Sequence, residues 1–541
     1  MNVLIISAEV APFAKVGGLA DVAGALPKAL HRQGHDVRVV MPCYKMIETN
    51  PQYAVEEIIS SFIVPVSQEL SECAFVKQTT IPIATDRSRT AEPTAATQTL
   101  DRIPVYLIGS PEPGTAELQS EEVQSTDRQT AIDQPPVRSS GYFQQATRSQ
   151  KVYTLEPEPY LFFCRAVLEM LNHLSPAWKP DILHCNDWQT GMVPVYARTF
   201  YQANDLVANA ATLFTIHNLA YQGNFDCNQW RKTGLPDALF HVDGLEFYGQ
   251  WTFMKGGVQF SDRVNTVSPN YAREIQTPEY GVGLDGLMRL KANQGRLSGI
   301  LNGIDYDEYD PETDPRLPAH FNRATPAGKA DCKAALQREL GLPVTDTSAI
   351  IGVVSRLADQ KGFDLIRANI EEMLALPVQF VLLGTGDQNY ERYFKELQAN
   401  YPAQVHAAIA FDIELAQRIY AGSDLFLMPS RFEPCGLGQL FALRYGTIPI
   451  VRATGGLADT ITDYDPVHSP DGNGFRFSDY SVEAMADAIR RAVAAWQEPA
   501  TRHLLVDRAL ASDFSWENAA QTYSELYEAA IATHRTSRHS A

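Results

Sequence analysis

The chain has 541 residues, of which 45% are hydrophobic and 20% are charged. That length is enough for two or three globular domains with substantial cores. Its 45 Lys and Arg residues against 64 Asp and Glu residues give a formal net charge of −19. Because such a charge repels polyanions, the composition argues against binding to nucleic acid or to an anionic membrane, and a phosphate-bearing ligand would need a local cluster of cations.

The seven cysteines are scattered and form no C-x-x-C pair. This spacing argues against a disulfide framework and against a structural zinc site. The chain begins with the strand-like run Val3–Ile6, has no basic leader before it, and contains no apolar run of transmembrane length. These features predict a cytoplasmic protein, or a protein of the plastid stroma if a transit peptide has been removed.

In the first half of the chain, short β-rich runs alternate with helical patterns, which predicts a parallel α/β domain. A helix is expected over Asp21–Leu30, and strands are expected over Val3–Ser7, Asp36–Val40, Asp181–His184 and Thr212–Ile216. From about residue 110 to residue 150 the chain is rich in Ser, Thr, Gln, Glu and Pro. That composition predicts a polar insertion without a catalytic role.

The α/β pattern restarts after about residue 298. Helices are expected over Asp364–Leu376 and Gly436–Tyr445, and strands over Ile350–Val354, Phe380–Leu383, Asp424–Met428 and Ile448–Val451. We therefore predict two doubly wound domains, residues 1–298 and 299–515, that face a central cleft, because ligands bind beyond the carboxyl ends of the strands in such sheets. A last helix is expected from about Trp516 to Ala532.

Two loops that follow predicted strands combine glycine with positive charge. In Lys15–Leu19, the glycines allow close approach of a ligand, the following helix start favours an anion, and Lys15 adds a charge. In Ser355–Gly362, the cations Arg356 and Lys361 can converge on one polyanion. Each loop by itself is more typical of an ordinary solvated turn.

Two further loops follow strands in the second half. In Pro429–Gly438, Glu433 could bind sugar hydroxyls while the backbone N–H groups from Gly436 onward face a phosphate; alternatively, Glu433 only offsets a helix dipole. Thr454–Leu457 contains a second Gly-Gly pair. Gly384–Asp387 contains a G-x-G, which is weaker evidence for a ligand site because this pattern often occurs by chance.

Taken together, the loops place three cations, Lys15, Arg356 and Lys361, where a diphosphate leaving group would need them if no metal is used. The pairs Asp305-x-Asp307 and Asp463-x-Asp465 lack a third ligand. We predict that both pairs form surface turns rather than a metal site.

Seven blocks, in order, resemble the glycogen and starch synthase family over nearly the whole chain apart from residues 80–150. The blocks begin Lys15-Val-Gly-Gly-Leu-Ala-Asp-Val, His184-Cys-Asn-Asp-Trp-Gln, Thr215-Ile-His-Asn-Leu-Ala-Tyr-Gln-Gly, Lys255-Gly-Gly, Leu301-Asn-Gly-Ile-Asp, Ser355-Arg and Glu433-Pro-Cys-Gly-Leu. The resemblance implies a GT-B fold of two Rossmann-like domains, with residues 516–541 packing back on the N-terminal domain. It implies retaining transfer of glucose from ADP-glucose to the non-reducing end of an α-1,4-glucan, without a metal or other cofactor.

By motif matching, the resemblance also implies roles for individual residues. The implied catalytic residues are Arg356, Lys361, Glu433 and His217. The implied substrate-binding residues are Lys15, Gly18, Asp21, Asn186, Asn302, Gly436, Leu437, Thr454 and Gly455. Arg356 and Lys361 would neutralise the developing diphosphate, and Glu433 would contact the donor glucose or ribose.

The chain departs from the family pattern at residues 153–160. Leu155-Glu156 and Pro159-Tyr160 replace the usual Asp-Asn and Arg-Phe, and Asn186 and Gln189 stand where many bacterial relatives have His. The added prolines would reshape the lip of the cleft, which concerns the acceptor more than the donor. A weakly catalytic or regulatory paralogue, or a synthase that prefers UDP-glucose, is therefore an alternative reading.

Overall fold

A computed structural model describes residues 1–67, 70–83, 102–113, 137–143 and 156–539. The chain divides into two compact units. Unit 1 comprises Met1–Thr266, Ile275–Ile300 and Trp516–Ala541, and unit 2 comprises Val267–Glu274 and Leu301–Ser515. The sequence predicts boundaries at residues 298 and 515, with residues 516–541 packing back on the N-terminal domain, and does not predict that residues 267–274 belong to unit 2. The polar insertion predicted near 110–150 falls largely outside the described residues.

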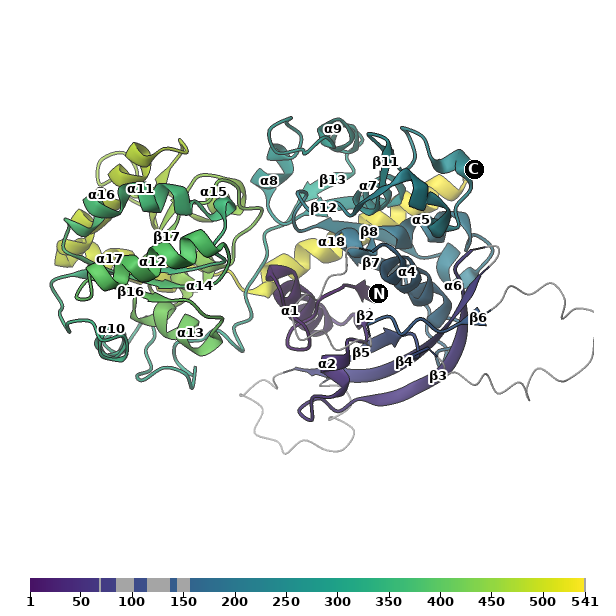
Figure 1. Ribbon diagram of the computed structural model, residues 1–541, viewed down its shortest axis with the longest axis horizontal. Helices are drawn as coiled ribbons and strands as arrows, with labels where there is room; N and C mark the ends of the chain where they lie inside the picture. Colours follow the sequence, from purple (N-terminus) through teal and green to yellow (C-terminus); the bar gives the residue numbers. More distant parts are fainter. Residues whose placement is uncertain (68–69, 84–101, 114–136, 144–155, 540–541) are drawn as a thin grey trace, which may run out of the picture. The chain divides into compact units, whose positions relative to one another are not determined.

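Unit 1 is built on a ten-stranded mixed sheet (Figure 1). Its main path runs β13 (Leu297–Gly299), β12 (Arg263–Thr266), β8 (Ala211–Ile216), β7 (Ile182–Asn186), β1 (Asn2–Ile6), β2 (Asp36–Pro42), β5 (Arg102–Gly109), β4 (Ser71–Pro82) and β3 (Glu56–Pro65), with β6 (Val137–Arg138) beside β4. All pairs from β13 to β5 are parallel, whereas β4 pairs antiparallel with both β5 and β3. The antiparallel extension was not predicted from the sequence.

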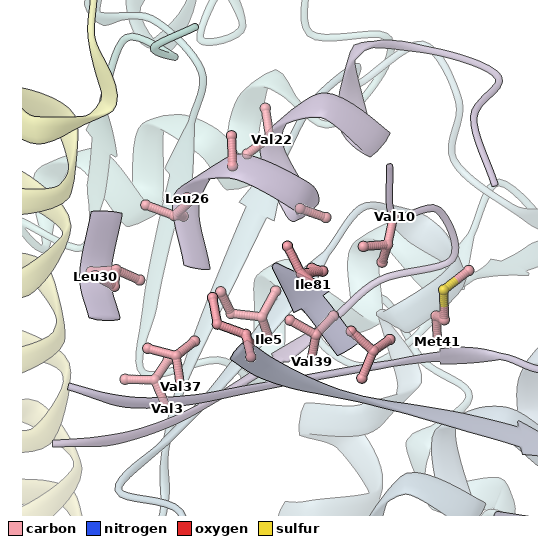
Figure 2. Close-up of a cluster of buried hydrophobic side chains, with 14 of the residues drawn as sticks. Val3, Ile5, Val10, Val22, Leu26, Leu30, Val37, Val39, Met41 and Ile81 are labelled. Carbon is pink, nitrogen blue, oxygen red and sulfur yellow. The ribbon is translucent and has the colours of Figure 1, made fainter. Parts of the chain in front are cut away.

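Both faces of this sheet are covered. Val3 and Ile5 of β1 join a buried cluster with α1 (Gly18–Arg32) and α18 (Trp516–His539), and Figure 2 shows the α1 side of that cluster. Leu4 and Ile6 point to the opposite face, because side chains alternate along a strand, and they are equally buried. The sheet is therefore doubly wound, as the near-continuous apolar strands predict.

The remaining elements of unit 1 surround this sheet. They are the helices α2 (Lys45–Glu48), α4 (Glu158–Met170), α5 (Met192–Thr199), α6 (Asp205–Ala208), α7 (Phe253–Phe260) and α9 (Asp285–Asn293), and the 3₁₀ turns η1 (Trp188–Thr190), η2 (Cys227–Thr233) and η3 (Asp237–Leu239). A small antiparallel sheet orders β10 (Glu246–Phe247), β11 (Gln250–Thr252) and β9 (Asn224–Asp226). In α4, Pro157 and Pro159 lie at the cap and in the first turn, where a missing N–H costs no hydrogen bond.

Unit 2 contains a six-stranded sheet in which every pair is parallel. Its order is β16 (Val405–Ala408), β15 (Val378–Leu383), β14 (Ala349–Val354), β17 (Leu425–Met428), β18 (Ile448–Arg452) and β19 (Phe475–Phe477). Counted along the chain, this is the order 3-2-1-4-5-6 of a Rossmann sheet. The sequence predicts this class of fold from its alternating strands and helices, but not the order.

The helices of unit 2 lie on both faces of its sheet. Ile351 and Val353 of β14 face one buried cluster with α11 (Phe363–Leu374) and α16 (Val482–Gln497). Ile350 faces another, with α10 (Gly328–Glu339) and α13 (Ile413–Gly422). The other elements are α8 (Pro269–Glu274), η4 (Asp359–Lys361), α12 (Gln388–Asn400), α14 (Gly438–Arg444), α15 (Gly455–Thr460) and α17 (Pro499–Ala511).

Two predicted helix boundaries are wrong. The helix expected from Gly436 begins at Gly438, because Gly436 has φ +73° and cannot join a right-handed helix. The last helix continues to His539 rather than ending near Ala532. Within the described part of the chain, no helix combines the length and apolar character needed to cross a membrane.

Candidate functional site

The strand order of each unit reverses at one point, where the loops leaving two neighbouring strands diverge. In unit 1 this switch point lies between β1 and β7, and in unit 2 it lies between β14 and β17. Ligands of doubly wound sheets bind at this point, beyond the carboxyl ends of the strands. Most of the predicted site residues lie in loops at these two edges.

In unit 2, Lys361 and Glu433 form the centre of the switch-point edge. Lys361 Nζ lies 2.6 Å from Glu433 Oε2, which also accepts a hydrogen bond from Ser430 Oγ at 3.0 Å. Glu433 is only 7% exposed, so these two partners replace most of the water that would otherwise solvate its carboxylate. The alternative reading, that Glu433 offsets a helix dipole, is wrong, because α14 begins only at Gly438 and Glu433 is paired with a cation instead.

The two loops that carry Lys361 and Glu433 are locked together. Arg431 N donates to Gln360 O at 2.8 Å, and Gln360 Nε2 donates to Phe432 O at 3.2 Å. Gly362 has φ +76°, and a Cβ on it would lie 2.1 Å from Pro429 O. Only glycine permits this approach, so the backbone itself brings Lys361 to Glu433.

Arg356 lies on the same edge, on a loop that rests on the Gly384–Gly386 turn. Leu357 N donates to Thr385 O at 2.9 Å, and a Cβ on Gly384 would lie 1.9 Å from Ser355 O. The G-x-G therefore has a supporting role that the sequence alone did not assign. Arg356 is exposed, and its guanidinium has no hydrogen-bond or ion-pair partner among the described residues.

Gly436, Leu437 and Asn302 lie around the start of α14. Leu437 is the N-cap residue of that helix and makes no side-chain cap. Asn302 is 5% exposed, and its Oδ1 is buried without a partner in the part of the chain that the structure describes. A buried acceptor without a donor is costly, so Asn302 fits the predicted role of binding a ligand hydroxyl. The neighbouring Cys435 is not reactive, because burial raises the pKa of its thiol to about 12.

Thr454 and Gly455, predicted to bind substrate, contact a carboxylate of α8. Glu274 Oε1 accepts from Gly455 N at 2.9 Å and from Thr454 Oγ1 at 3.1 Å. Gly455 has φ +45°, and a Cβ on it would lie 1.8 Å from Glu433 O. Gly455 thus packs directly beneath the Glu433 loop, and Glu274 is a neighbour that the sequence analysis missed.

In unit 1, the Lys15 loop is organised by two carboxylates. Lys15 Nζ lies 2.6 Å from Asp21 Oδ1, and both side chains are partly exposed. Val16 N and Gly17 N donate to Glu9 Oε2 at 2.5 and 3.0 Å. These two backbone amides therefore donate to a carboxylate of the protein itself. The next residue, Gly18, is exposed and begins α1.

Two carboxylates lie at the switch point of unit 1: Glu9, which is buried, and Asp187, which is half-buried. Burial raises the pKa of Glu9 to about 7, against the lowering effect of its two amide donors and with a further rise from Asp21. Burial likewise raises the pKa of Asp187 to about 7, and the charge of Glu9 adds to that rise. Asp187 has φ +56°, a strained conformation for a non-glycine residue, and such strain concentrates at functional sites.

His217 follows β8 and is held by Asn186, the last residue of β7, and by Asp187, which follows that strand. Its backbone N–H donates to Asp187 Oδ1 at 2.8 Å, and its ring Nε2 lies 3.0 Å from Asn186 Oδ1. Burial lowers the pKa of His217 to about 3, so the ring is neutral at physiological pH.

The structure thus brings together Lys361 with Glu433, Lys15 with Asp21, and Asn186 with His217. The sequence analysis missed Glu9, Asp187, Glu274 and Gly362; the position of Glu9 and Asp187 just after two neighbouring strands was the available signal. Among the described residues, no three His, Cys, Asp or Glu side chains are grouped as a metal site. Asp305 Oδ1 accepts from Asp307 N and Asp465 Oδ1 accepts from Val467 N, as in the predicted turns, whereas Asp463 Oδ1 accepts from Arg476 N, 13 residues away.

Two Rossmann-like units in one chain, each with charged, glycine-rich loops at its switch point, define a GT-B glycosyltransferase. Residues 2–290 match the family model of the starch synthase catalytic domain, and residues 341–505 match that of glycosyl transferases group 1. The chain belongs to the glycogen and starch synthase family and is a glucan-elongating glycosyltransferase, as the sequence motifs predict.

Individual relatives match this chain in sequence over nearly their full length. A glycogen synthase of Thermosipho africanus is 44% identical over 98% of this chain and 99% of its own, and that of Thermotoga maritima is 43% identical with the same coverage. Among solved structures, the catalytic domain of starch synthase IV from Arabidopsis thaliana, bound to ADP and acarbose, has a TM-score of 0.82 and 33% identity, covering 98% of this chain and 99% of that one.

Proposed function

We propose that the chain transfers glucose from ADP-glucose to the non-reducing end of an α-1,4-glucan, with retention of the anomeric configuration and without a metal. The observation that carries the proposal is the switch point of unit 2, where Arg356, exposed and without a partner among the described residues, accompanies the ion pair of Lys361 with Glu433. Two cations that approach one diphosphate can do the work of a divalent metal ion. The relative that was solved with ADP supports an adenine nucleotide as donor.

In this mechanism the bond between glucose C1 and the diphosphate oxygen breaks, and a bond from C1 to the acceptor hydroxyl oxygen forms. Negative charge develops on the departing diphosphate, where Arg356 and Lys361 stabilise it. The proton of the acceptor hydroxyl passes to the departing phosphate oxygen. Glu433 orients Lys361 through their 2.6 Å contact and offers its carboxylate to a sugar hydroxyl of the donor.

The remaining predicted residues take binding roles in the proposal. Asn302, Gly436 and Leu437 surround the donor at the start of α14, where Asn302 Oδ1 supplies an unused acceptor. In unit 1, Lys15, Gly18 and Asp21 bind phosphate or sugar hydroxyls, and neutral His217 contacts a glucose hydroxyl.

The choice of donor base is tested by steady-state kinetics with ADP-glucose and UDP-glucose side by side, using glycogen as acceptor. We expect kcat/KM to be higher for ADP-glucose by at least about tenfold, which corresponds to one well-formed polar contact. A higher kcat/KM for UDP-glucose would refute the proposed donor. Binding of ADP-glucose without incorporation of label into glycogen would instead identify a regulatory paralogue.

The anomeric outcome is tested separately, by proton NMR of the elongated glucan. New α-1,4 linkages are expected, and β linkages would refute retention. The prolines of the divergent 153–160 segment do not favour the paralogue, because the described ones lie at the start of α4, where proline is well tolerated.

A further inference from the structure

Asn186 is buried beside Nε2 of the His217 ring, at the carboxyl end of β7. It is 1% exposed, whereas His217 is partly exposed. A ligand that reaches the imidazole therefore does not reach the amide. The sequence predicts that Asn186 binds substrate, but its surroundings indicate a different role.

The orientation of the Asn186 amide is determined by its neighbours. Its Nδ2 lies 3.2 Å from Ile6 O and 3.2 Å from His184 O. Both are backbone carbonyls, which only accept hydrogen bonds, so the NH₂ group must face them. The amide oxygen is thereby left to face His217.

This orientation decides which ring nitrogen of His217 carries the proton. Asn186 Oδ1 can only accept, and it lies 3.0 Å from His217 Nε2, so Nε2 must donate. A neutral imidazole carries one N–H, and burial keeps this ring neutral. Nδ1 therefore has a lone pair, and no described residue donates to it.

We infer that Asn186 is a positioning residue that holds His217 in the Nε2-protonated tautomer, so that Nδ1 is presented as a hydrogen-bond acceptor to a hydroxyl of the sugar substrate. The tautomer itself follows from geometry, whereas its use on a sugar rests on the proposed function. A buried amide whose donors and acceptor are all engaged has one stable orientation, which makes the acceptor a fixed feature of the site.

The tautomer can be observed directly by NMR of the intact protein labelled with ¹⁵N-histidine, in which His217→Gln identifies the signals. In the unaltered protein we expect Nε2 of His217 to be protonated and Nδ1 to be unprotonated from pH 6 to pH 8. The opposite tautomer, or a protonated ring, would overturn the inference, and this measurement requires no catalytic activity.

The role of Asn186 is tested by Asn186→Leu, with Asn265→Leu as a matched control. Asn265 is also a fully buried amide in this sheet, bonded to Thr215 and Tyr523 but not to His217. We expect Asn186→Leu to give mixed tautomers and a loss of about tenfold in kcat/KM, and Asn265→Leu to keep the tautomer. An unchanged tautomer in Asn186→Leu, or an equal change in the control, would refute the positioning role. A shifted tautomer with unchanged kcat/KM would show instead that Nδ1 is not used on the substrate.

Discussion

Replacing Lys361 by alanine removes one cation from the candidate donor site and one partner from Glu433. If Lys361 stabilises the departing diphosphate, its loss should cost about 3 kcal/mol of transition-state stabilisation, as for other preorganised charge contacts. That corresponds to a fall of roughly 150-fold in kcat. The change in KM for the donor should be smaller, because the charge on the diphosphate grows as the bond breaks.

The same substitution also affects folding. The side chain of Glu433 is 9% exposed, and without Lys361 its one remaining side-chain partner within the described ranges is Ser430, at 3.0 Å. Leaving a buried carboxylate with one partner should cost on the order of 1–3 kcal/mol of stability. Activity must therefore be measured on protein shown to be folded by circular dichroism and thermal unfolding.

Lys333→Ala is the matched control for this loss of stability. Lys333 Nζ lies 2.8 Å from Asp424 Oδ2, and the two side chains are 11% and 14% exposed, close to the values for Lys361 and Glu433. Lys333 is on α10 and touches none of the predicted site residues. Lys333→Ala should lower the unfolding temperature and leave kcat nearly unchanged. Near-normal kcat in folded Lys361→Ala, or an equal loss in Lys333→Ala, would refute the proposed role of Lys361.

Three further predictions concern stability and local geometry. Tyr527→Phe should lower the free energy of unfolding by about 1–3 kcal/mol, because Nδ1 of fully buried His184 loses its hydrogen-bond partner at 2.9 Å. Faster amide exchange in α18 would measure this loss, and unchanged exchange would contradict it. Glu9→Gln should remove a pH dependence of the free energy of unfolding. The pKa of Glu9 is about 7 in the folded chain against 4.5 ordinarily. Its favourable contribution to stability is therefore complete below pH 4.5 and is lost as pH rises to 7. Urea unfolding of both proteins from pH 5 to pH 8 should show the wild type losing up to about 3 kcal/mol relative to the variant, and parallel curves would argue against it. Gly455→Ala should displace Glu433 and reduce kcat at least about tenfold, since its Cβ would lie 1.8 Å from Glu433 O. Gly17→Ala should fold normally, because a Cβ at that position has nothing within 4 Å. Equal thermal unfolding temperatures of the two variants would count against this reading.

The sequence by itself determined the class of fold and most of the loops that carry the site. Apolar strand runs such as Val3–Ile6 and Ile350–Val354 are local signals of buried parallel strands, and glycines after strands mark close backbone approaches. The family motifs then identified the glycogen and starch synthase family. These features are readable because each depends on neighbouring residues in the chain.

The tertiary structure alone decided the pairings between distant segments. Lys361 meets Glu433 across 72 residues, and His184 meets Tyr527 across 343. The orientation of Asn186, and with it the tautomer of His217, depends on carbonyls of two strands that lie side by side only in the folded sheet. Hydrogen-bond partners and burial are properties of the packed chain, so no local pattern in the sequence specifies them.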